Sequence, residues 1–68
     1  MKAPDLARDC RLRKGWSLRE AAQRMGIHYT TLGRYERGDF PITLEAAKAM
    51  ARLYGKSAVQ FLPALKDI

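Results

Sequence analysis

The stretch that decides the fold is SLREAAQRMGIHYTTLGRYE, residues 17–36. It opens on a capping box, in which the Ser17 hydroxyl accepts a hydrogen bond from an unpaired backbone N–H and Glu20 reaches back to the start of the helix. Gly26 favours an end to this first helix, and a second helix with a different surface follows. Two short helices joined through residues 25–28 predict a helix-turn-helix over about residues 17–36.

Outward from this stretch, glycine and proline divide the chain into short segments. Helices are expected over about residues 4–14, 17–25, 29–36 and 44–54, with a short fifth helix after Ser57 that contains Val59, Phe61 and Leu62. The alternation of β-branched residues that is typical of strands does not occur in the sequence. The sequence therefore predicts an all-α fold, a compact bundle of four to five short helices that forms one domain over residues 1–68.

Apolar residues recur at helical spacing and are expected to face a common core. Trp16 precedes the first cap and can pack onto Ala21 as a hydrophobic staple. Cys10 is expected to be a buried, inert thiol, since one cysteine can form neither an internal disulfide nor a zinc site. The residues expected to point inward are Leu6, Ala7, Cys10, Trp16, Met25, Ile27, Leu32, Tyr35, Leu44, Ala47, Met50, Ala51, Tyr54 and Phe61.

Charge is spread unevenly along the 68 residues, whose net charge is +6. Residues 1–38 hold nine Lys or Arg and four acids, whereas residues 39–68 hold four and three. A basic half suits a polyanion such as nucleic acid, although a merely soluble basic surface carries the same charge. Neither a membrane-length apolar run nor a secretory signal is visible, so a cytoplasmic protein is expected.

The second helix of the motif has a polar face without an acid. This face carries His28, Tyr29, Thr30, Thr31, Gly33 and Arg34, and Glu36 comes only at the end. A solvated helix usually mixes acids into its polar face, so this composition favours contact with an anion. In a helix-turn-helix, the second helix enters the major groove of DNA by its N-terminal residues, while the first lies across the backbone.

Four segments carry a family resemblance. They are Gly15–Ala22, Met25-Gly26-Ile27, Leu32–Gly38 and Ile42–Glu45, and the Glu-Arg-Gly turn at residues 36–38 with its spacing from Ala21-Ala22 is the most specific part. Together they resemble the lambda-repressor-like Cro and repressor helix-turn-helix family (XRE type) over roughly residues 6–62. The resemblance implies a sequence-specific regulator of transcription that binds double-stranded DNA. It is expected to be a Cro-like repressor, encoded by a bacterium or a phage.

The resemblance also implies roles for individual residues. Base contacts fall on His28, Tyr29, Thr30 and Arg34, and phosphate contacts on Arg11, Ser17, Arg19, Thr31, Arg37 and Phe40. An ion pair between Arg11 and Glu36 is expected to link the first helix to the end of the third. Some alternatives stay open: Tyr29 can pack as a half-buried aromatic, Arg34 can bind a phosphate instead of guanine, and Gly33 can admit either DNA or the first helix.

Two positions depart from the family pattern. Leu18 stands where the family commonly has a Gln that braces the recognition helix. His28 stands where Ser or Thr is common before that helix, and histidine is expected to be a poor N-cap.

The chain is expected to bind an inverted-repeat operator as a homodimer on DNA. One small domain reads only a few base pairs, which is too little to select a site in a genome. The dimer contact is expected at Phe61, Leu62, Leu65 and Ile68, where the C-terminal segment is more apolar than a free tail should be. The alternative is that Leu62, Leu65 and Ile68 fold back onto their own core.

Other classes of function have less support in the sequence. The single histidine has no Cys or acid at metal-ligand spacing, and no phosphate-binding loop occurs. We therefore do not expect an enzyme, and we expect no cofactor, metal or small-molecule ligand. The main alternative is an antitoxin or adaptor whose chief role is to bind a partner protein. The acid-free second helix argues against a pure protein adaptor, whereas an antitoxin would still bind DNA.

Overall fold

A computed structural model describes residues 2–62 of the chain. Four α-helices and a 3₁₀ turn follow one another along it: α1 (Ala3–Arg13), α2 (Leu18–Met25), α3 (Tyr29–Arg37), α4 (Leu44–Tyr54) and η1 (Ala58–Phe61). The described residues form no strand. The predicted all-α bundle is confirmed, with helix ends within one residue of those expected from the caps and glycines.

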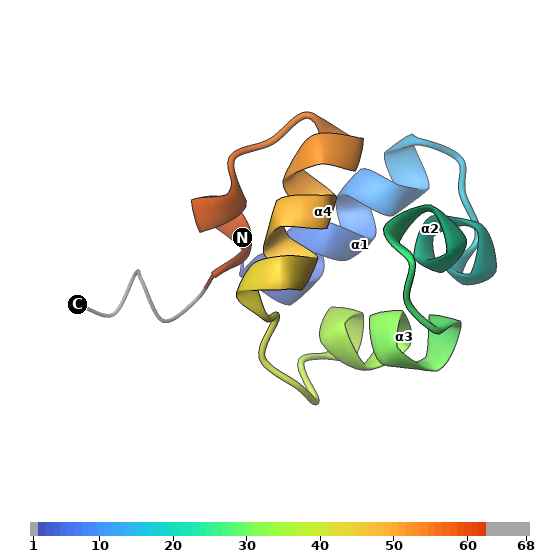
Figure 1. The fold of residues 1–68 in the computed structure, drawn as a ribbon, viewed down its shortest axis with the longest axis horizontal. Helices are drawn as coiled ribbons and strands as arrows, with labels where there is room; N and C mark the ends of the chain where they lie inside the picture. The colour runs from blue at the N-terminus through green and yellow to red at the C-terminus, as the bar shows by residue number, and fades with distance from the viewer. Residues whose placement is uncertain (1, 63–68) are drawn as a thin grey trace.

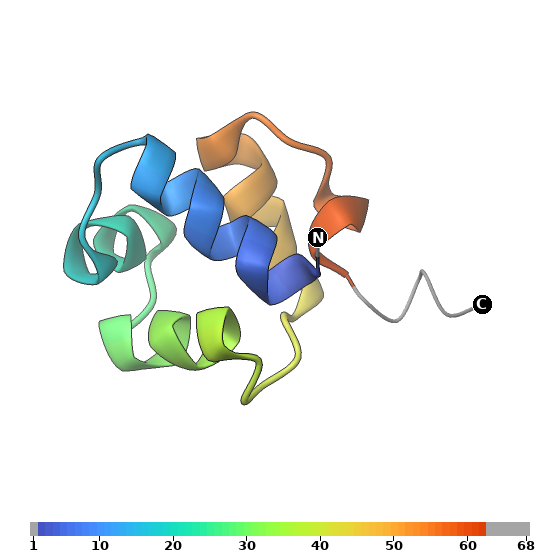
Figure 2. The same cartoon turned by 180° about the vertical axis from the view of Figure 1, so that it is seen from behind.

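The core lies where α1 and α4 cross, with η1 closing one end and α2 and α3 the other (Figures 1 and 2). Its largest fully buried side chains are Phe61, Leu32 and Met50. Several of the buried residues are alanines, and a methyl side chain lets two helix axes approach closely. The buried alanines are Ala3, Ala7, Ala21, Ala22, Ala46, Ala47 and Ala49.

The two ends of α2 fix where α3 begins. Ser17 Oγ accepts a hydrogen bond from the Glu20 backbone N–H at 3.1 Å. The Glu20 carboxylate, however, accepts from Arg24 at 3.2 Å, so the expected capping box is only half made. At the other end Gly26 adopts φ +76°, and the Ile27 N–H donates to the Ala22 carbonyl at 3.0 Å. This left-handed cap turns the chain sharply toward α3.

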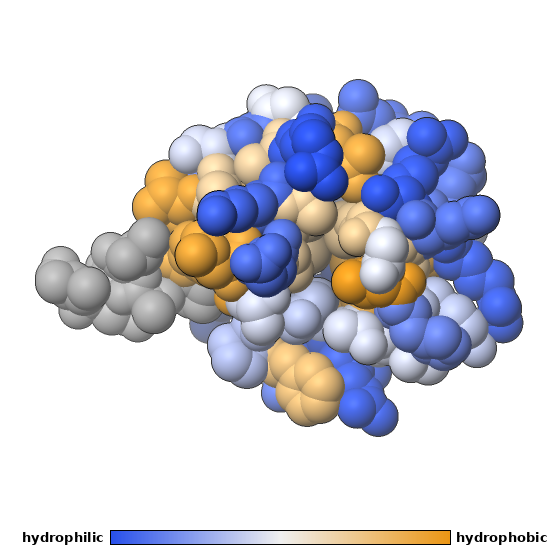
Figure 3. Space-filling model, viewed as in Figure 1, coloured by the Kyte–Doolittle hydropathy of each residue, from blue (hydrophilic) through white to orange (hydrophobic). Residues whose placement is uncertain are grey.

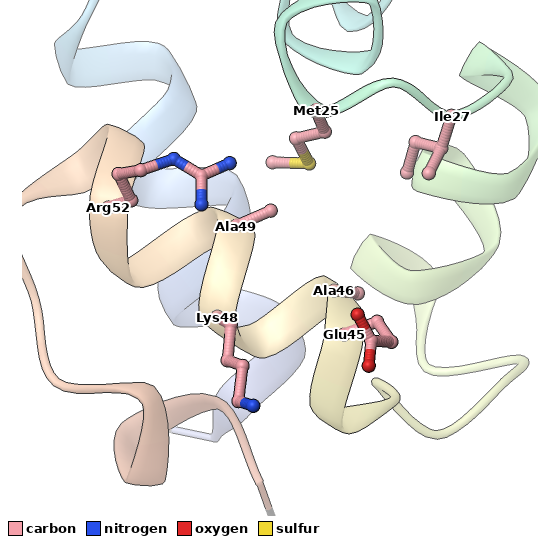
Figure 4. A pocket seen from close by; sticks show the side chains of 7 residues that line it. All are labelled: Met25, Ile27, Glu45, Ala46, Lys48, Ala49 and Arg52. Carbon is pink, nitrogen blue, oxygen red and sulfur yellow. The ribbon is translucent and has the colours of Figure 1, made fainter.

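The turn between α2 and α3 packs toward α4. Met25 and Ile27 point from the turn toward Ala46 and Ala49 of α4, and a hollow of about 270 Å³ remains between them (Figure 4). Charged side chains of α4, Lys48 and Arg52 among them, lie at its edge. The turn is therefore fixed against the bundle on the side away from the exposed face of α3.

One residue expected in the core, Leu44, is exposed instead. Leu44 is 52% exposed because, as the first residue of α4, it lies beyond the part of the helix that packs. Trp16 packs against the core as expected but is only partly buried, between Tyr54 and the Arg24 guanidinium.

The expected dimer interface is wrong at Phe61. It is fully buried in its own core, with its ring 6.3 Å from that of Tyr54, so it is not free to contact a second copy. In a 3₁₀ turn, residues three apart share a face, which places Ala58 and Phe61 inward and leaves Val59 47% exposed. Leu62 is partly buried against the same core, and Leu65 and Ile68 lie outside the described residues.

Candidate nucleic-acid interface

The N-terminus of α3 is capped by a histidine. The His28 Nδ1 accepts a hydrogen bond from the Thr30 backbone N–H at 3.2 Å and lies 2.8 Å from Thr30 Oγ1. The expectation that His28 caps poorly is wrong, because its ring nitrogen occupies the place that a Ser or Asp oxygen takes in the usual cap. The cap fixes the imidazole at the exposed start of the helix.

Tyr29 lies between two other side chains. The His28 ring stacks on it with centroids 4.6 Å apart and an interplanar angle of 28°. The Arg19 guanidinium of α2 lies 4.0 Å from the Tyr29 ring centroid. This cation–π contact joins α2 to the start of α3, where the family commonly uses a Gln. A guanidinium that stacks by its face keeps its N–H donors free at the edge, so Arg19 can still bind a phosphate.

Arg34, which lies on α3 like Tyr29, also contacts an aromatic ring. The Arg34 guanidinium lies 5.1 Å from the centroid of Phe40, which is 44% exposed in the loop after α3. The Phe40 backbone N–H faces the Arg34 carbonyl at 3.5 Å, which leaves it less available to a phosphate than expected. Arg37 pairs instead with Asp39 at 3.1 Å, and both of these side chains are exposed.

Four of the expected contact residues border one hollow. Tyr29, Thr30, Arg34 and Arg37 line it, and its volume is about 230 Å³. Leu18 and Gly33 complete the lining; Gly33 was expected on this face without a contact role, and Leu18 was not expected in the site. A Cβ at Gly33 would lie 3.2 Å from Arg37 Nη1 and 3.8 Å from Leu18 Cδ1. The missing side chain at Gly33 therefore makes room for the Arg37 and Leu18 side chains. Close approach of the first helix, one of the two possibilities left open, is not the reason for this glycine.

An ion pair fastens α3 to α1 from behind. Arg11 Nε and Nη2 donate to the two carboxylate oxygens of Glu36 at 2.9 and 3.0 Å, and Nη1 donates to the Trp16 carbonyl at 2.9 Å. The side chains are only 11% and 5% exposed. Because its three terminal nitrogens are already bonded inside the protein, Arg11 is a poor candidate for the phosphate contact that was also expected of it.

The remaining expected residues lie around this face. Ser17 and Arg19 are exposed at the start of α2, and Thr31 is partly buried in the first turn of α3. Hydrophilic side chains dominate over α2, whereas over α4 and η1 apolar side chains lie among charged ones (Figure 3). Within residues 2–62, Arg19 and Arg34 contact no carboxylate, so their charge is available to an anionic partner.

Other kinds of site find no support in the described part of the chain. No three side chains of the metal-ligating types come together within it. Cys10 is buried, and burial raises the pKa of its thiol, which keeps it protonated and unreactive. None of the helices in this part is both long and apolar enough to cross a bilayer.

The fold and the exposed basic face of α3 define a DNA-binding helix-turn-helix domain. Comparison with known families matches residues 8–61 to a helix-turn-helix family, and the chain belongs to this family, which is of the Cro and repressor type. It is also 36% identical over 59 residues to a protein of Pyrococcus abyssi that is named a putative HTH-type transcriptional regulatory protein.

That match covers 87% of this chain but only 19% of the relative, so the chain spans about a fifth of the relative's length. No solved structure gives a significant match. The family places residues 8–61 among DNA-binding helix-turn-helix domains.

Proposed function

We propose that the chain is a sequence-specific repressor of the Cro type, which places α3 in the major groove of double-stranded DNA. The observation that carries this proposal is the surface of α3, where Tyr29, Thr30 and Arg34 line one hollow together with Arg37. Arg34 can donate two hydrogen bonds to the O6 and N7 atoms of guanine, and Arg19 and Arg37 flank the groove at phosphate-binding positions.

The geometry favours DNA over a protein partner on this face. The exposed guanidiniums of Arg19 and Arg34 rest on aromatic rings and face no acid in residues 2–62. A protein-binding helix normally presents an apolar centre. Here the exposed large apolar side chains, Leu12, Phe40, Leu44 and Val59, belong to four different segments and form no such centre on α3.

Selection of bound duplexes from random DNA tests the proposal. We expect enrichment of one short motif, arranged as an inverted repeat. Arg34→Ala should weaken binding to the selected site by about five- to a hundredfold and relax preference at one base pair. Arg37→Ala should instead weaken binding to cognate and random DNA alike. If no motif is enriched, or if the two variants behave identically, base reading through α3 is refuted.

We further propose that two copies bind such an operator, with their α3 helices about 34 Å apart. The support is the small reading surface of a single α3 of nine residues. With Phe61 buried, the proposed contact rests on Leu62 and on Leu65 and Ile68, which lie outside the described residues. Band shifts on full and half operators, with wild type and Leu65→Asp, test it. Equal affinity for half and full operators would show that no cooperative dimer forms.

A reporter gene that carries the selected operator over its promoter distinguishes repression from activation. We expect the protein, produced in the cytoplasm of a bacterial host, to lower reporter expression, because a bound domain of this size excludes other proteins from the groove that it occupies. Expression that rises with the amount of protein would refute the repressor role while leaving DNA binding intact.

A further inference from the structure

The cap of α3 fixes the position of the proton on His28. The Thr30 backbone nitrogen lies 3.2 Å from His28 Nδ1, and a backbone amide can only donate a hydrogen bond. Nδ1 must therefore carry a lone pair and no proton. A neutral imidazole has one N–H, so in this arrangement it lies on Nε2, at the far side of the ring from the helix.

The same cap fixes the direction of the Thr30 hydroxyl. Thr30 Oγ1 lies 2.8 Å from His28 Nδ1. Because Nδ1 has no proton to give, the hydroxyl donates its own hydrogen to Nδ1, and its oxygen keeps only lone pairs for an outside partner. The exposed start of α3 thus presents one donor, His28 Nε2–H, and one acceptor, Thr30 Oγ1.

The stack of side chains around Tyr29 holds this arrangement in place. His28 packs on the Tyr29 ring at 4.6 Å, and Arg19 lies 4.0 Å from the centroid of that ring. If the imidazole turned over, a carbon would replace Nδ1 at Thr30, and both hydrogen bonds of the cap would be lost. Arg19 packs on the same ring as His28, so it is a positioning residue for His28, through Tyr29, in addition to any phosphate that it binds.

We propose that His28 and Thr30 together select adenine. In the major groove adenine presents the N7 acceptor beside the 6-amino donor, whereas guanine presents two acceptors, N7 and O6. The His28 Nε2–H donates to adenine N7, and Thr30 Oγ1 accepts from the 6-amino group. Guanine at the same place would put O6 against the Thr30 oxygen, which has no hydrogen to offer. This inference rests on the proposed function, since it requires α3 to lie in the major groove.

The first step of the test is the duplex selection, because a failure to find any operator refutes the proposed function and not the adenine contact in particular. Each adenine of the operator is then replaced in turn by 7-deazaadenine, in which a C–H replaces N7. Affinities are measured by fluorescence anisotropy for wild type and for His28→Ser, which keeps an N-cap but loses the Nε2 donor. Melting curves check that the variant folds.

At one adenine we expect the wild type to lose about two- to tenfold in affinity, the worth of one hydrogen bond. His28→Ser should be weaker on the natural operator by the same factor and lose nothing more with 7-deazaadenine there. Guanine at this position should weaken the wild type, and Thr30→Val should lose that discrimination. No sensitive adenine, a loss that persists in His28→Ser, or a preference for guanine would each overturn the proposal.

The free protein gives an independent readout. Nitrogen-15 NMR of the neutral His28 ring should show an unprotonated Nδ1 and a protonated Nε2. The opposite tautomer would overturn the inference without bearing on whether the protein binds DNA.

Discussion

Tyr54 has a buried hydroxyl that finds no hydrogen-bond partner among the described residues. Burial, together with the Glu36 carboxylate, raises the pKa of Tyr54 to about 12. Below pH 10 the hydroxyl is neutral in both the folded and the unfolded chain. Between about pH 10 and 12 it ionises only in the unfolded chain, so the free energy of unfolding falls by up to about 2–3 kcal/mol over that window.

Tyr54→Phe removes both effects while keeping the ring. We expect it to raise the free energy of unfolding by about 1 kcal/mol at pH 7, since a buried unsatisfied hydroxyl is lost. The further fall between pH 10 and 12 should be smaller than in the wild type. Urea denaturation at a series of pH values measures both quantities, and Tyr29→Phe, on the exposed face, serves as the control. An alkaline profile of Tyr54→Phe parallel to that of the wild type would contradict the assignment.

Substitution of Gly33 by alanine should have opposite effects on stability and on DNA binding. Alanine there should raise the free energy of unfolding by up to about 1 kcal/mol, because glycine is a poor helix former and the clash at 3.2 Å involves only the flexible end of Arg37. The added methyl also narrows the hollow on α3 and displaces the Arg37 guanidinium. We therefore expect Gly33→Ala to melt higher and to bind its operator several-fold more weakly. A variant that binds DNA as well as the wild type would show that the hollow is not used.

At the scale of the elements, α1 and α3 are joined by the bidentate Arg11–Glu36 pair. Glu36→Gln leaves the buried guanidinium without its charge partner, which should lower the free energy of unfolding by about 3–5 kcal/mol. Asp39→Asn removes a partner of an exposed pair with Arg37 and should cost less than about 1 kcal/mol. Thermal melts of the two variants make the comparison, and equal melting points would contradict a structural role for the pair. The double variant Arg11→Met/Glu36→Leu should be more stable than Glu36→Gln, because no unpaired charge stays buried.

Element boundaries were predictable because their causes are local. Ser17 and Gly26 lie at the two ends of α2, where the sequence placed them, and Thr43, Gly38 and Gly55 likewise cap the helix ends beside them. The orientation of Leu44 was not predictable from helical spacing, which gives a face but not the extent of the neighbouring helices. Phe61 was expected both in the core and in the dimer contact, because a short apolar segment does not show which side of it the core covers.

The candidate site was predictable in membership but not in geometry. The family pattern pointed to Tyr29, Thr30 and Arg34, which border one hollow. The cap by His28, the stacking of Arg19 on Tyr29 and the inclusion of Leu18 depend on distances between two helices. Leu18 carried one usable signal, its departure from the family's Gln, because the missing brace had to be replaced by another contact between α2 and α3.

At the scale of the whole molecule, the net charge of +6 predicts binding that depends strongly on salt. Each phosphate that a cation neutralises contributes roughly −0.9 to the slope of log K against log salt concentration. If two copies bind a full operator through equivalent contacts, the slope on the full operator should be about twice that on a half operator. A slope that is equal on both would indicate that only one copy contacts DNA.

Arg19→Gln tests this account residue by residue. It should make the slope less steep by roughly 0.9 on a half operator and by roughly 1.8 on a full operator, since one phosphate contact is lost from each copy. Arg13 is the matched control, because it is the exposed last residue of α1, whose C-terminal end lies away from α3 (Figure 2), and it already pairs with Asp9 at 2.8 Å. Anisotropy titrations at several salt concentrations should therefore give Arg13→Gln the wild-type slope. If Arg19→Gln weakens binding with its slope unchanged, Arg19 acts only by positioning Tyr29 and His28, and the phosphate contact proposed for it is wrong.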